Sequence, residues 1–328
     1  MNSTIKTVII TGSAGFIGSH LAEYFLTSGY CVIGIDNFAT GMKSNTEHLK
    51  TFPQFTFINA DVCLPWTEII SHIDPQSLEK LEYVFHFASP ASPPLYQALS
   101  LETLKVNSVG LENALRFATQ YQARVIFAST SEVYGDPSVH PQPESYWGNV
   151  NSFGERSCYD EAKRFGEALI YSFNKKMQTN HGLVRIFNTY GPKMNPHDGR
   201  VVINFIKQAL LNEPLTVYGD GQQTRSFCYI DDLVAGIVKY AQSTLAEPVN
   251  LGNPNEFTIL ELAEIVREKF GAGKSEIKHS PMPSDDPLQR KPDIQKAKAH
   301  LNWEPRIKLD EGLMKTYNWL KTQKLLQN

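Results

Sequence analysis

A strand, a glycine-rich turn and a helix follow one another near the start of the chain, and this order constrains the fold more than any other feature. The β-branched run Thr7–Ile10 predicts a buried strand. The turn Thr11–Gly18 comes directly after it, and apolar residues at helical spacing follow as Ile17, Leu21 and Phe25. A turn of this kind between a strand and a helix is typical of the first unit of a doubly wound parallel sheet.

The glycines of that turn predict a dinucleotide-binding site. Gly12 allows the chain to turn tightly, Gly15 lets the backbone approach a pyrophosphate, and Gly18 lets the helix lie close to the strand. The first helical turn, which contains Phe16 and Ile17, directs free N–H groups and the positive end of the helix dipole at the phosphates.

The second predicted strand, residues 31–36, ends in Asp36, and Asn37 follows it. A carboxylate at this place can accept hydrogen bonds from both ribose hydroxyls of the cofactor. The same charge repels a 2′-phosphate. We therefore expect NAD rather than NADP as the cofactor.

Strand-like and helical patterns alternate through the first half of the chain, which predicts an α/β fold with a Rossmann-like, doubly wound parallel sheet. Strands are expected near 6–10, 31–36, 55–59, 82–88, 124–129 and 182–188, and helices near 16–28, 102–120 and 155–178. In such sheets the ligand site lies at the carboxyl ends of the strands. That rule brings together Asp36, Asp61, Ala88, Thr130 and Asn188.

After Asn188 the pattern becomes irregular, with short elements and turn signals. We expect an NAD-binding domain over residues 1–188, with a return segment near 226–252. Residues 189–225 and 253–328 are expected to form a smaller C-terminal substrate-binding lobe.

Tyr159 and Lys163 are four residues apart in a predicted helix, so the phenol and the ammonium share one face. A cation beside a phenol favours the phenolate, which predicts a base that works below its usual pKa. Thr130, at the end of a buried strand, can bond the same substrate oxygen. Removal of a proton from an alcohol, with hydride transfer to a dinucleotide, is the chemistry this set predicts.

Composition excludes several other classes of function. The net charge of −3 gives no basic field for nucleic acid, and no apolar run is long enough to span a membrane. The N-terminus leads directly into the first strand, with no secretory signal ahead of it. The four cysteines are far apart, so neither disulfides nor a zinc site is expected, and a reducing cytoplasm fits this pattern.

Longer segments carry a resemblance to a known family. The chain resembles the extended short-chain dehydrogenase/reductases that act on nucleotide sugars, and within them the UDP-glucuronate decarboxylase (UDP-xylose synthase) subfamily. The glycine turn and Tyr-x-x-x-Lys are common to the whole superfamily. The subfamily is indicated by segments 88–94, 129–137, 146–148, 158–161, 185–192 and 290–293, above all by the Ser-Pro-rich loop, Glu132 and Arg290.

The resemblance implies decarboxylation of UDP-glucuronate to UDP-xylose through a 4-keto intermediate, with NAD taking and returning the C4 hydride. It places Glu132 and Arg290 in the decarboxylation step, where we expect them to orient the sugar rather than to pair tightly with its carboxylate. It also implies a homodimer, paired through the helices near 102–120 and 155–178.

The same resemblance implies further ligand contacts. The expected cofactor contacts are Thr40, Gly41, Asp61, Val62, Ala88, Ser89, Tyr159, Lys163, Thr189 and Arg200. The expected substrate contacts are Lys105, Asn188, Tyr218, Arg225 and Arg290. No metal site is expected.

Other interpretations of these residues remain open at this stage. Glu132 could be a solvated acid at a strand end, Arg290 could belong to a solvated charged loop, and Lys105 could extend from its helix into water. A 4,6-dehydratase usually has an acid where Ser131 stands, and a 4-epimerase does not need Glu132. A protein that senses NAD without turnover would typically have lost Tyr159 or Lys163.

Overall fold

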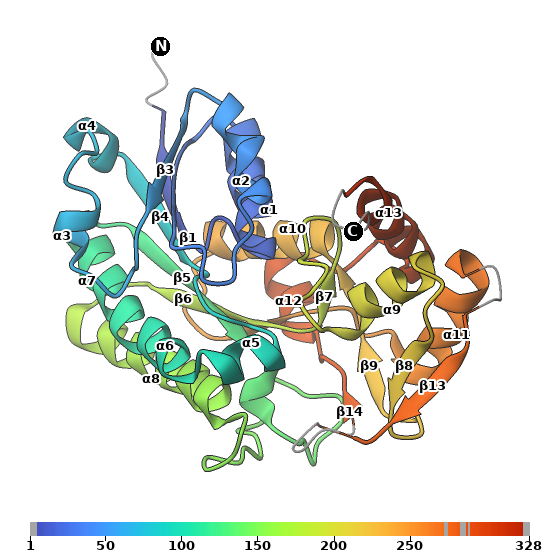
Figure 1. Ribbon diagram of the computed structural model, residues 1–328. Coiled ribbons are helices and arrows are strands. Elements are labelled where there is room, and N and C mark those ends of the chain that lie inside the picture. The colour runs from blue at the N-terminus through green and yellow to red at the C-terminus, as the bar shows by residue number, and fades with distance from the viewer. Residues whose placement is uncertain (1–4, 272–274, 283–286, 288, 324–328) are drawn as a thin grey trace.

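The computed structural model describes residues 5–271, 275–282, 287 and 289–323. Its centre is a parallel sheet of seven strands in the order β11-β6-β5-β4-β1-β2-β3 (Figure 1). The strands are β1 (Thr7–Thr11), β2 (Cys31–Asp36), β3 (Phe55–Asn59), β4 (Leu81–His86), β5 (Arg124–Thr130), β6 (Gly182–Ile186) and β11 (Val249–Leu251). The predicted α/β fold with a parallel, Rossmann-like sheet is confirmed, and six of its strands lie within two residues of their predicted ends.

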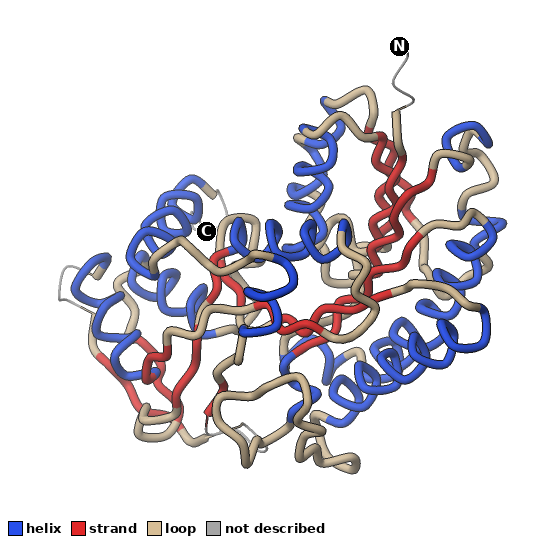
Figure 2. Tube along the Cα trace, turned by 180° about the vertical axis from the view of Figure 1, so that it is seen from behind, coloured by secondary structure: helices blue, strands red, loops and turns tan. Residues whose placement is uncertain are grey.

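Helices cover both faces of this sheet, because its strands are apolar on both sides. On one face α1 (Phe16–Thr27) lies beside α10 (Ile230–Gln242), and the two helices contact each other. The other face is covered by α3 (Trp66–Ile69), α7 (Leu111–Gln120) and α8 (Ser157–Met177). Figure 2 shows this layering from behind.

The helix expected over 102–120 is interrupted. It consists of α6 (Ser100–Lys105), a π-helical segment η2 (Val106–Gly110) and α7. The Val106 carbonyl oxygen lies 3.0 Å from Nε2 of His86, and the Asn107 side chain donates to Ser89 Oγ. These contacts tie the irregular segment to the end of β4, a connection that a helical sequence pattern does not reveal.

The rest of the chain adds short elements around the sheet. In the first half these are α2 (Ser44–Glu47), η1 (Leu49–Thr51), α4 (Pro75–Leu78), α5 (Pro93–Ala98) and η3 (Ser131–Tyr134). In the second half they are β7 (Thr189–Tyr190), α9 (Val201–Leu210), β8 (Leu215–Tyr218), β9 (Thr224–Ser226), β10 (Cys228–Tyr229), β12 (Glu256–Thr258), α11 (Ile259–Phe270), β13 (Ile277–Ser280), β14 (Gln289–Arg290), α12 (Gln295–Leu301) and α13 (Leu309–Thr322).

Residues after β6 contribute to both parts of the molecule. Strand β11 pairs with β6 and so returns the chain to the central sheet. Strands β8 and β13 form one small sheet, and β12, β9 and β14 form another (Figure 1). Strand β14 pairs with β9 so that Arg290 lies opposite Arg225. Among the helices formed by described residues, none combines the length and apolarity needed to cross a membrane.

Candidate active site

A cleft of about 750 Å³ lies where the carboxyl ends of the sheet strands face the short elements of the second half. Its walls come from the glycine turn, the ends of β5 and β6, helix α8 and the segment 215–227. Sixteen of the predicted site residues line it: Gly12, Gly15, Phe16, Ile17, Gly18, Thr40, Ser89, Thr130, Glu132, Tyr159, Lys163, Asn188, Thr189, Arg200, Tyr218 and Arg225.

The glycine turn has the geometry that a dinucleotide requires. Gly12 has a φ of +72°, and a Cβ at Gly18 would lie 2.0 Å from the Gly12 carbonyl oxygen, so no side chain fits between turn and helix. Helix α1 begins directly after Gly15, and among the described residues no side chain caps its N-terminus. The amides of its first turn face the cleft, where they can hold a pyrophosphate. The residues therefore fit the cofactor.

Asp36 ends β2 beside this turn. Its carboxylate accepts hydrogen bonds from the backbone N–H of Ala14 at 2.9 Å and of Phe38 at 2.7 Å. Burial raises the pKa of Asp36 although both hydrogen bonds oppose the shift. A Cβ at Gly41 would lie 3.0 Å from the Asp36 carboxylate, so the two predicted cofactor residues are neighbours.

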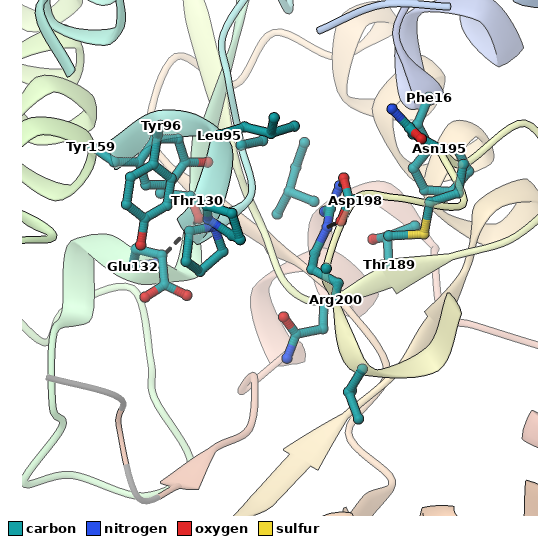
Figure 3. A pocket seen from close by; sticks show the side chains of 18 of the residues that line it. Phe16, Leu95, Tyr96, Thr130, Glu132, Tyr159, Thr189, Asn195, Asp198 and Arg200 are labelled. Atoms are coloured by element: carbon teal, nitrogen blue, oxygen red, sulfur yellow. Dashed lines mark hydrogen bonds and ion pairs between the residues drawn. The ribbon is translucent and has the colours of Figure 1, made fainter. Parts of the chain in front are cut away.

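Thr130 and Tyr159 meet at the end of β5 (Figure 3), and Lys163 lines the same cleft. The Thr130 hydroxyl accepts from the Glu132 N–H at 3.2 Å and hydrogen-bonds the Tyr159 phenol, which lowers the pKa of that phenol. The Lys163 ammonium lies 5.6 Å from the centroid of the Tyr159 ring and donates to the Ala128 carbonyl at 2.7 Å. Helix α8 thus presents the phenol and the amine to the same part of the cleft.

The pKa values of this pair are set mainly by burial. Burial raises the pKa of Tyr159 to about 12 and lowers that of Lys163 to about 7. The predicted lowering of the phenol pKa is therefore not found in the protein without its cofactor. The reason is that the hydrogen bond from Thr130 does not outweigh the desolvation of a fully enclosed phenol.

Tyr96, from α5, is a contact that the sequence did not predict. Its ring stacks on that of Tyr159, with centroids 4.8 Å apart and planes 5° from parallel (Figure 3). Tyr96 is 1% exposed, and its buried hydroxyl has no hydrogen-bond partner among the described residues. Helix α5, which follows the Ser-Pro-rich loop, therefore positions the ring of Tyr159.

Glu132 is held between two arginines. One of its carboxylate oxygens accepts from Arg290 Nη1 at 2.9 Å, and the other accepts from Arg156 Nη2 at 2.6 Å. Arg290 also donates to Ser131 Oγ at 2.9 Å and to the Gly135 carbonyl at 2.7 Å. The positive charges of Arg290 and Arg156 lower the pKa of Glu132 to about 2 against the effect of burial, so this acid is ionised.

These contacts exclude the two solvated interpretations. Arg290 is 1% exposed and does not belong to a solvated loop, and Glu132 is ion-paired. Asp285 and Asp286, which precede Arg290 in the charged stretch, lie outside the described residues. Arg156 is a second residue that sequence reasoning missed; its only signal was its place three residues before Tyr159.

The remaining predicted residues do not line the cleft. Asn37, Gly41, Asp61, Val62 and Ala88 lie just past the ends of β2, β3 and β4, and Asp61 accepts from the Cys63 N–H at 2.9 Å. Lys105 is exposed. Burial raises the pKa of the Cys63 thiol to about 12, and the charge of Lys105 opposes this shift only weakly. The substrate contact of Lys105 stays a prediction.

Residues 8–252 match the model of the NAD dependent epimerase/dehydratase family. The chain belongs to this family. Curated proteins match a longer part of the chain than the family model does. The chain is 48% identical to UDP-glucuronic acid decarboxylase 1 of Xenopus tropicalis, over 97% of this chain and 73% of that protein. It is 49% identical to UDP-glucuronic acid decarboxylase 1 of Arabidopsis thaliana, over 93% of this chain and 68% of that protein.

Solved structures are similar over nearly the whole fold. The crystal structure of UDP-glucuronic acid 4-epimerase from Bacillus cereus, in complex with UDP-glucuronic acid and NAD, has a TM-score of 0.84 and 29% identity. The match covers 96% of this chain and 99% of that chain. The family is NAD-dependent. Similar structures include an epimerase, so structural similarity alone does not identify the reaction.

Proposed function

We propose that this protein is an NAD-dependent decarboxylase that converts UDP-glucuronate to UDP-xylose through a UDP-4-keto intermediate. The observation that carries the proposal is the ionised Glu132, held by Arg290 and Arg156 beside the Thr130–Tyr159 pair. The identity of about 48% to curated decarboxylases supports the same reaction.

The first step needs a base at the sugar 4-hydroxyl. Tyr159 takes that proton, and Thr130 donates a hydrogen bond where negative charge develops on the oxygen. NAD, when bound, would supply the acceptor for the C4 hydride and the hydride that is returned, so it would be unchanged by a turnover. When bound, the oxidised cofactor would bring a positive charge to the site, and this charge would oppose the effect of burial on the pKa of Tyr159. Lys163, whose amine lies 5.6 Å from the centroid of the Tyr159 ring, adds a positive charge when it is protonated.

Oxidation at C4 makes the C6 carboxylate a β-keto acid. The C5–C6 bond then breaks, carbon dioxide leaves, and the electron pair moves into the C4 ketone as an enolate. Thr130 and Tyr159 stabilise this oxyanion by hydrogen bonds. A proton then forms the new C–H bond at C5, and hydride return to C4 completes the pentose.

In this proposal Glu132 orients the sugar, and Arg290, which does not line the cleft, acts by holding Glu132. The donors of Arg290 that have partners are directed to Glu132, Ser131 and the Gly135 carbonyl, all acceptors of the protein itself. A tight ion pair with the substrate carboxylate would stabilise the ground state and slow the loss of carbon dioxide. The contacts of Arg290 support orientation over direct pairing.

The diphosphate and the base of the substrate belong to the second half of the chain. We assign Asn188 and Arg225 to the diphosphate, because an arginine matches phosphate oxygens with its planar fork of donors. Tyr218 lines the cleft at the end of β8 and is assigned to the uracil. Strand β14 pairs with β9, so the arginine that holds Glu132 and the arginine assigned to the diphosphate lie opposite each other on adjacent strands.

Product analysis tests this function. The protein, loaded with NAD, is incubated with UDP-glucuronate, and the nucleotide products are identified by mass spectrometry and NMR. We expect UDP-xylose and carbon dioxide, with C4 deuterium passing through the nicotinamide. UDP-galacturonate as product would identify an epimerase. Absence of any product, together with retained NAD binding, would identify a sensor.

The presence of serine at position 131 disfavours a dehydratase. This residue stands where the related dehydratases carry an acid, and its hydroxyl accepts from Arg290. A serine hydroxyl is a far weaker acid than a carboxyl group, so Ser131 is a poor proton donor for a departing C6 hydroxyl. Incubation with a hexose nucleotide tests this directly, because a 4-keto-6-deoxy sugar as product would overturn the assignment.

We also propose a homodimer that pairs through α6, η2 and α8. Their outer surfaces expose large apolar side chains, with Leu101 at 65%, Val109 at 45%, Phe165 at 50% and Tyr171 at 67% exposure. Leu169 and Phe173, on the same helix as Phe165, pack against the core and are not part of this surface. Light scattering tests this pairing. We expect the wild type to be a dimer and the Phe165→Glu variant to be a monomer.

A further inference from the structure

Asn250 is a buried polar side chain at a junction of segments that lie far apart in the sequence. It lies in β11 and is fully buried. Its Oδ1 atom accepts from the Tyr134 hydroxyl at 2.8 Å. Its Nδ2 atom donates to the Gln142 carbonyl at 2.9 Å and to the Asp293 carbonyl at 3.0 Å. The oxygen and both hydrogens of this amide therefore have partners.

The junction connects the segments that carry Glu132 and Arg290. Tyr134 is the last residue of η3, which contains Glu132. Asp293 follows β14, which ends at Arg290. Neither Asn250 nor Tyr134 lines the cleft. The amide of Asn250 thus bridges, from behind the cleft, the two backbone segments whose side chains form the buried ion pair.

Gln142 fixes the β14 side of this junction. Its Oε1 atom accepts from the Lys291 N–H at 2.8 Å, and its own N–H donates to the Lys291 carbonyl at 2.9 Å. The Gln142 carbonyl accepts from the Asp293 N–H at 3.0 Å as well as from Asn250. Because Lys291 follows Arg290 directly, these bonds determine where the side chain of Arg290 begins.

The η3 side of the junction is anchored to the central fold. The Tyr134 hydroxyl accepts from Arg185 Nη1 at 2.9 Å. Arg185, in β6, is ion-paired with Glu167 of α8 at 2.7 Å, and Glu167 accepts from the Ser129 hydroxyl of β5 at 2.6 Å. The contacts among Arg185, Glu167 and Ser129 do not involve Asn250. They should therefore remain when its amide is removed.

Stability alone does not explain this junction. A fully hydrogen-bonded buried polar group is often no more stabilising than an apolar group of the same shape. What it provides is a fixed geometry, since each hydrogen bond has a preferred distance and direction. The ion pair of Glu132 and Arg290 needs such a geometry, because its partners are 158 residues apart in the sequence.

We propose that Asn250 is a positioning residue for decarboxylation, because it holds η3 and β14 at the separation at which Arg290 binds Glu132. The inference rests on the proposed function, in which Glu132 orients the sugar for the loss of carbon dioxide. Tyr159 is positioned separately, by its stacking on Tyr96. Loss of the Asn250 amide should therefore slow decarboxylation more than it slows oxidation at C4.

Asn250→Ala removes the bridge. We expect turnover of UDP-glucuronate to fall by roughly threefold to tenfold, because catalysis is sensitive to small displacements of an orienting group. The fraction of enzyme that holds NADH during turnover should rise above that of the wild type, since oxidation continues while decarboxylation is slowed. The absorbance of bound NADH measures this fraction. A fall in turnover without a rise in bound NADH would overturn the proposal.

A double-mutant cycle shows whether Asn250 acts through Glu132. If the amide serves only to position this carboxylate, Asn250→Ala should lower the turnover of the Glu132→Gln variant by less than roughly twofold. General damage to the fold predicts the same fold-loss in the wild-type and Glu132→Gln backgrounds. Equal losses in the two backgrounds would therefore contradict the role.

Tyr134→Phe keeps the proposal testable if Asn250→Ala does not fold. The variant removes one hydroxyl and keeps a ring that can pack against Phe187. It cuts the η3 side of the junction and leaves the contacts of Gln142 with Lys291 in place. We expect bound NADH to rise here too, with a smaller loss of turnover. Full turnover with unchanged bound NADH would show that the bridge is not needed.

Asn174→Ala is the matched control. Asn174 lies near the end of α8 that is remote from Tyr159. Its amide also connects separate segments, since it donates to the His181 carbonyl at 2.8 Å and accepts from the Thr179 hydroxyl at 3.0 Å. This variant should lose thermal stability but keep wild-type turnover and the wild-type level of bound NADH. A rise in bound NADH equal to that of Asn250→Ala would mean that the signal reports general damage, and would overturn the proposal.

The product assay separates the two levels of inference. A wild type that forms no UDP-xylose refutes the proposed function. A wild type that forms UDP-xylose, together with unchanged bound NADH in Asn250→Ala, refutes only the role of Asn250.

Discussion

The two halves of the cleft are built in different ways. The half that faces the cofactor is local: residues 7–36 supply the strand, the turn, the helix N-terminus and the acid at the end of β2. Its contacts are largely made by the backbone, and side chains are excluded, as at Gly18. The half that faces the sugar is assembled from distant segments, since Glu132, Arg156 and Arg290 meet from η3, α8 and β14.

This difference explains how one fold supports several reactions. A backbone cradle for a pyrophosphate is independent of what happens to the sugar, so it can stay the same while the reaction changes. Side-chain ion pairs between distant segments can be exchanged without disturbing the sheet. The reaction should therefore depend on the long-range cluster, and cofactor binding should depend on the local turn.

Tyr159→Phe should have the largest effect on turnover. Tyr159 is the proposed base for the proton of the sugar hydroxyl, and the hydride transfer to the cofactor depends on that proton transfer. The phenyl ring keeps the stacking on Tyr96 but cannot accept the proton. Loss of a general base typically costs 10² to 10⁴ in rate, and we expect a fall of about 10³. UDP-xylose formation and NAD content measured on the same sample test this; NAD content should be unchanged. A variant that turns over at the wild-type rate would show that another group is the base.

The same contrast determines how much could be predicted from the sequence. The glycine turn, Asp36 and the pair Tyr159 and Lys163 follow from spacing within single elements, and six of the seven strands were placed correctly. Arg156 could not be assigned, because its partner Glu132 lies 24 residues away and no spacing rule connects them. Arg290 required a family resemblance, since its contact with Glu132 spans 158 residues.

Burial was the other property hidden from sequence reasoning. A phenol and an ammonium on one helix face indicate a lowered phenol pKa only if both remain hydrated. Here the sheet and Tyr96 enclose both groups. Burial raises the pKa of the phenol and lowers that of the amine, so each group favours its neutral form. The sequence pattern of α8 shows which residues share a face but not how deeply that face is covered.

Gly18→Ala would break the cofactor half selectively. The added Cβ would lie 2.0 Å from the Gly12 carbonyl oxygen, so α1 must move away from the turn. Overpacking of this kind costs about 1–3 kcal/mol, which corresponds to a loss of NAD affinity of roughly 10- to 100-fold. Fluorescence titration with NAD, with UDP affinity as the internal control, tests it. Unchanged NAD affinity would mean that the turn tolerates the shift.

Glu132→Gln would break the sugar half selectively. The amide keeps the shape but removes the charge that pairs with Arg290 and Arg156. We expect turnover to fall by roughly tenfold or more, about 1.4 kcal/mol in activation free energy, while NAD affinity stays the same. Because breaking a buried pair is destabilising, thermal unfolding must be measured alongside the rate. Equal losses of NAD affinity and turnover would contradict the separation of the two halves.

Asp36→Asn should have the smallest effect and changes only which dinucleotide binds. The amide still has an oxygen that can accept from Ala14 and Phe38, so the turn should keep its shape. Removing the negative charge removes the repulsion of a 2′-phosphate. We expect NAD affinity to fall and NADP affinity to rise, each by roughly threefold to tenfold, on the scale of one weak charge interaction. Competitive titration of the two dinucleotides measures the ratio, and UDP affinity should not change. A variant that discriminates as strongly as the wild type would show that steric exclusion by the backbone around β2, rather than charge, selects the cofactor.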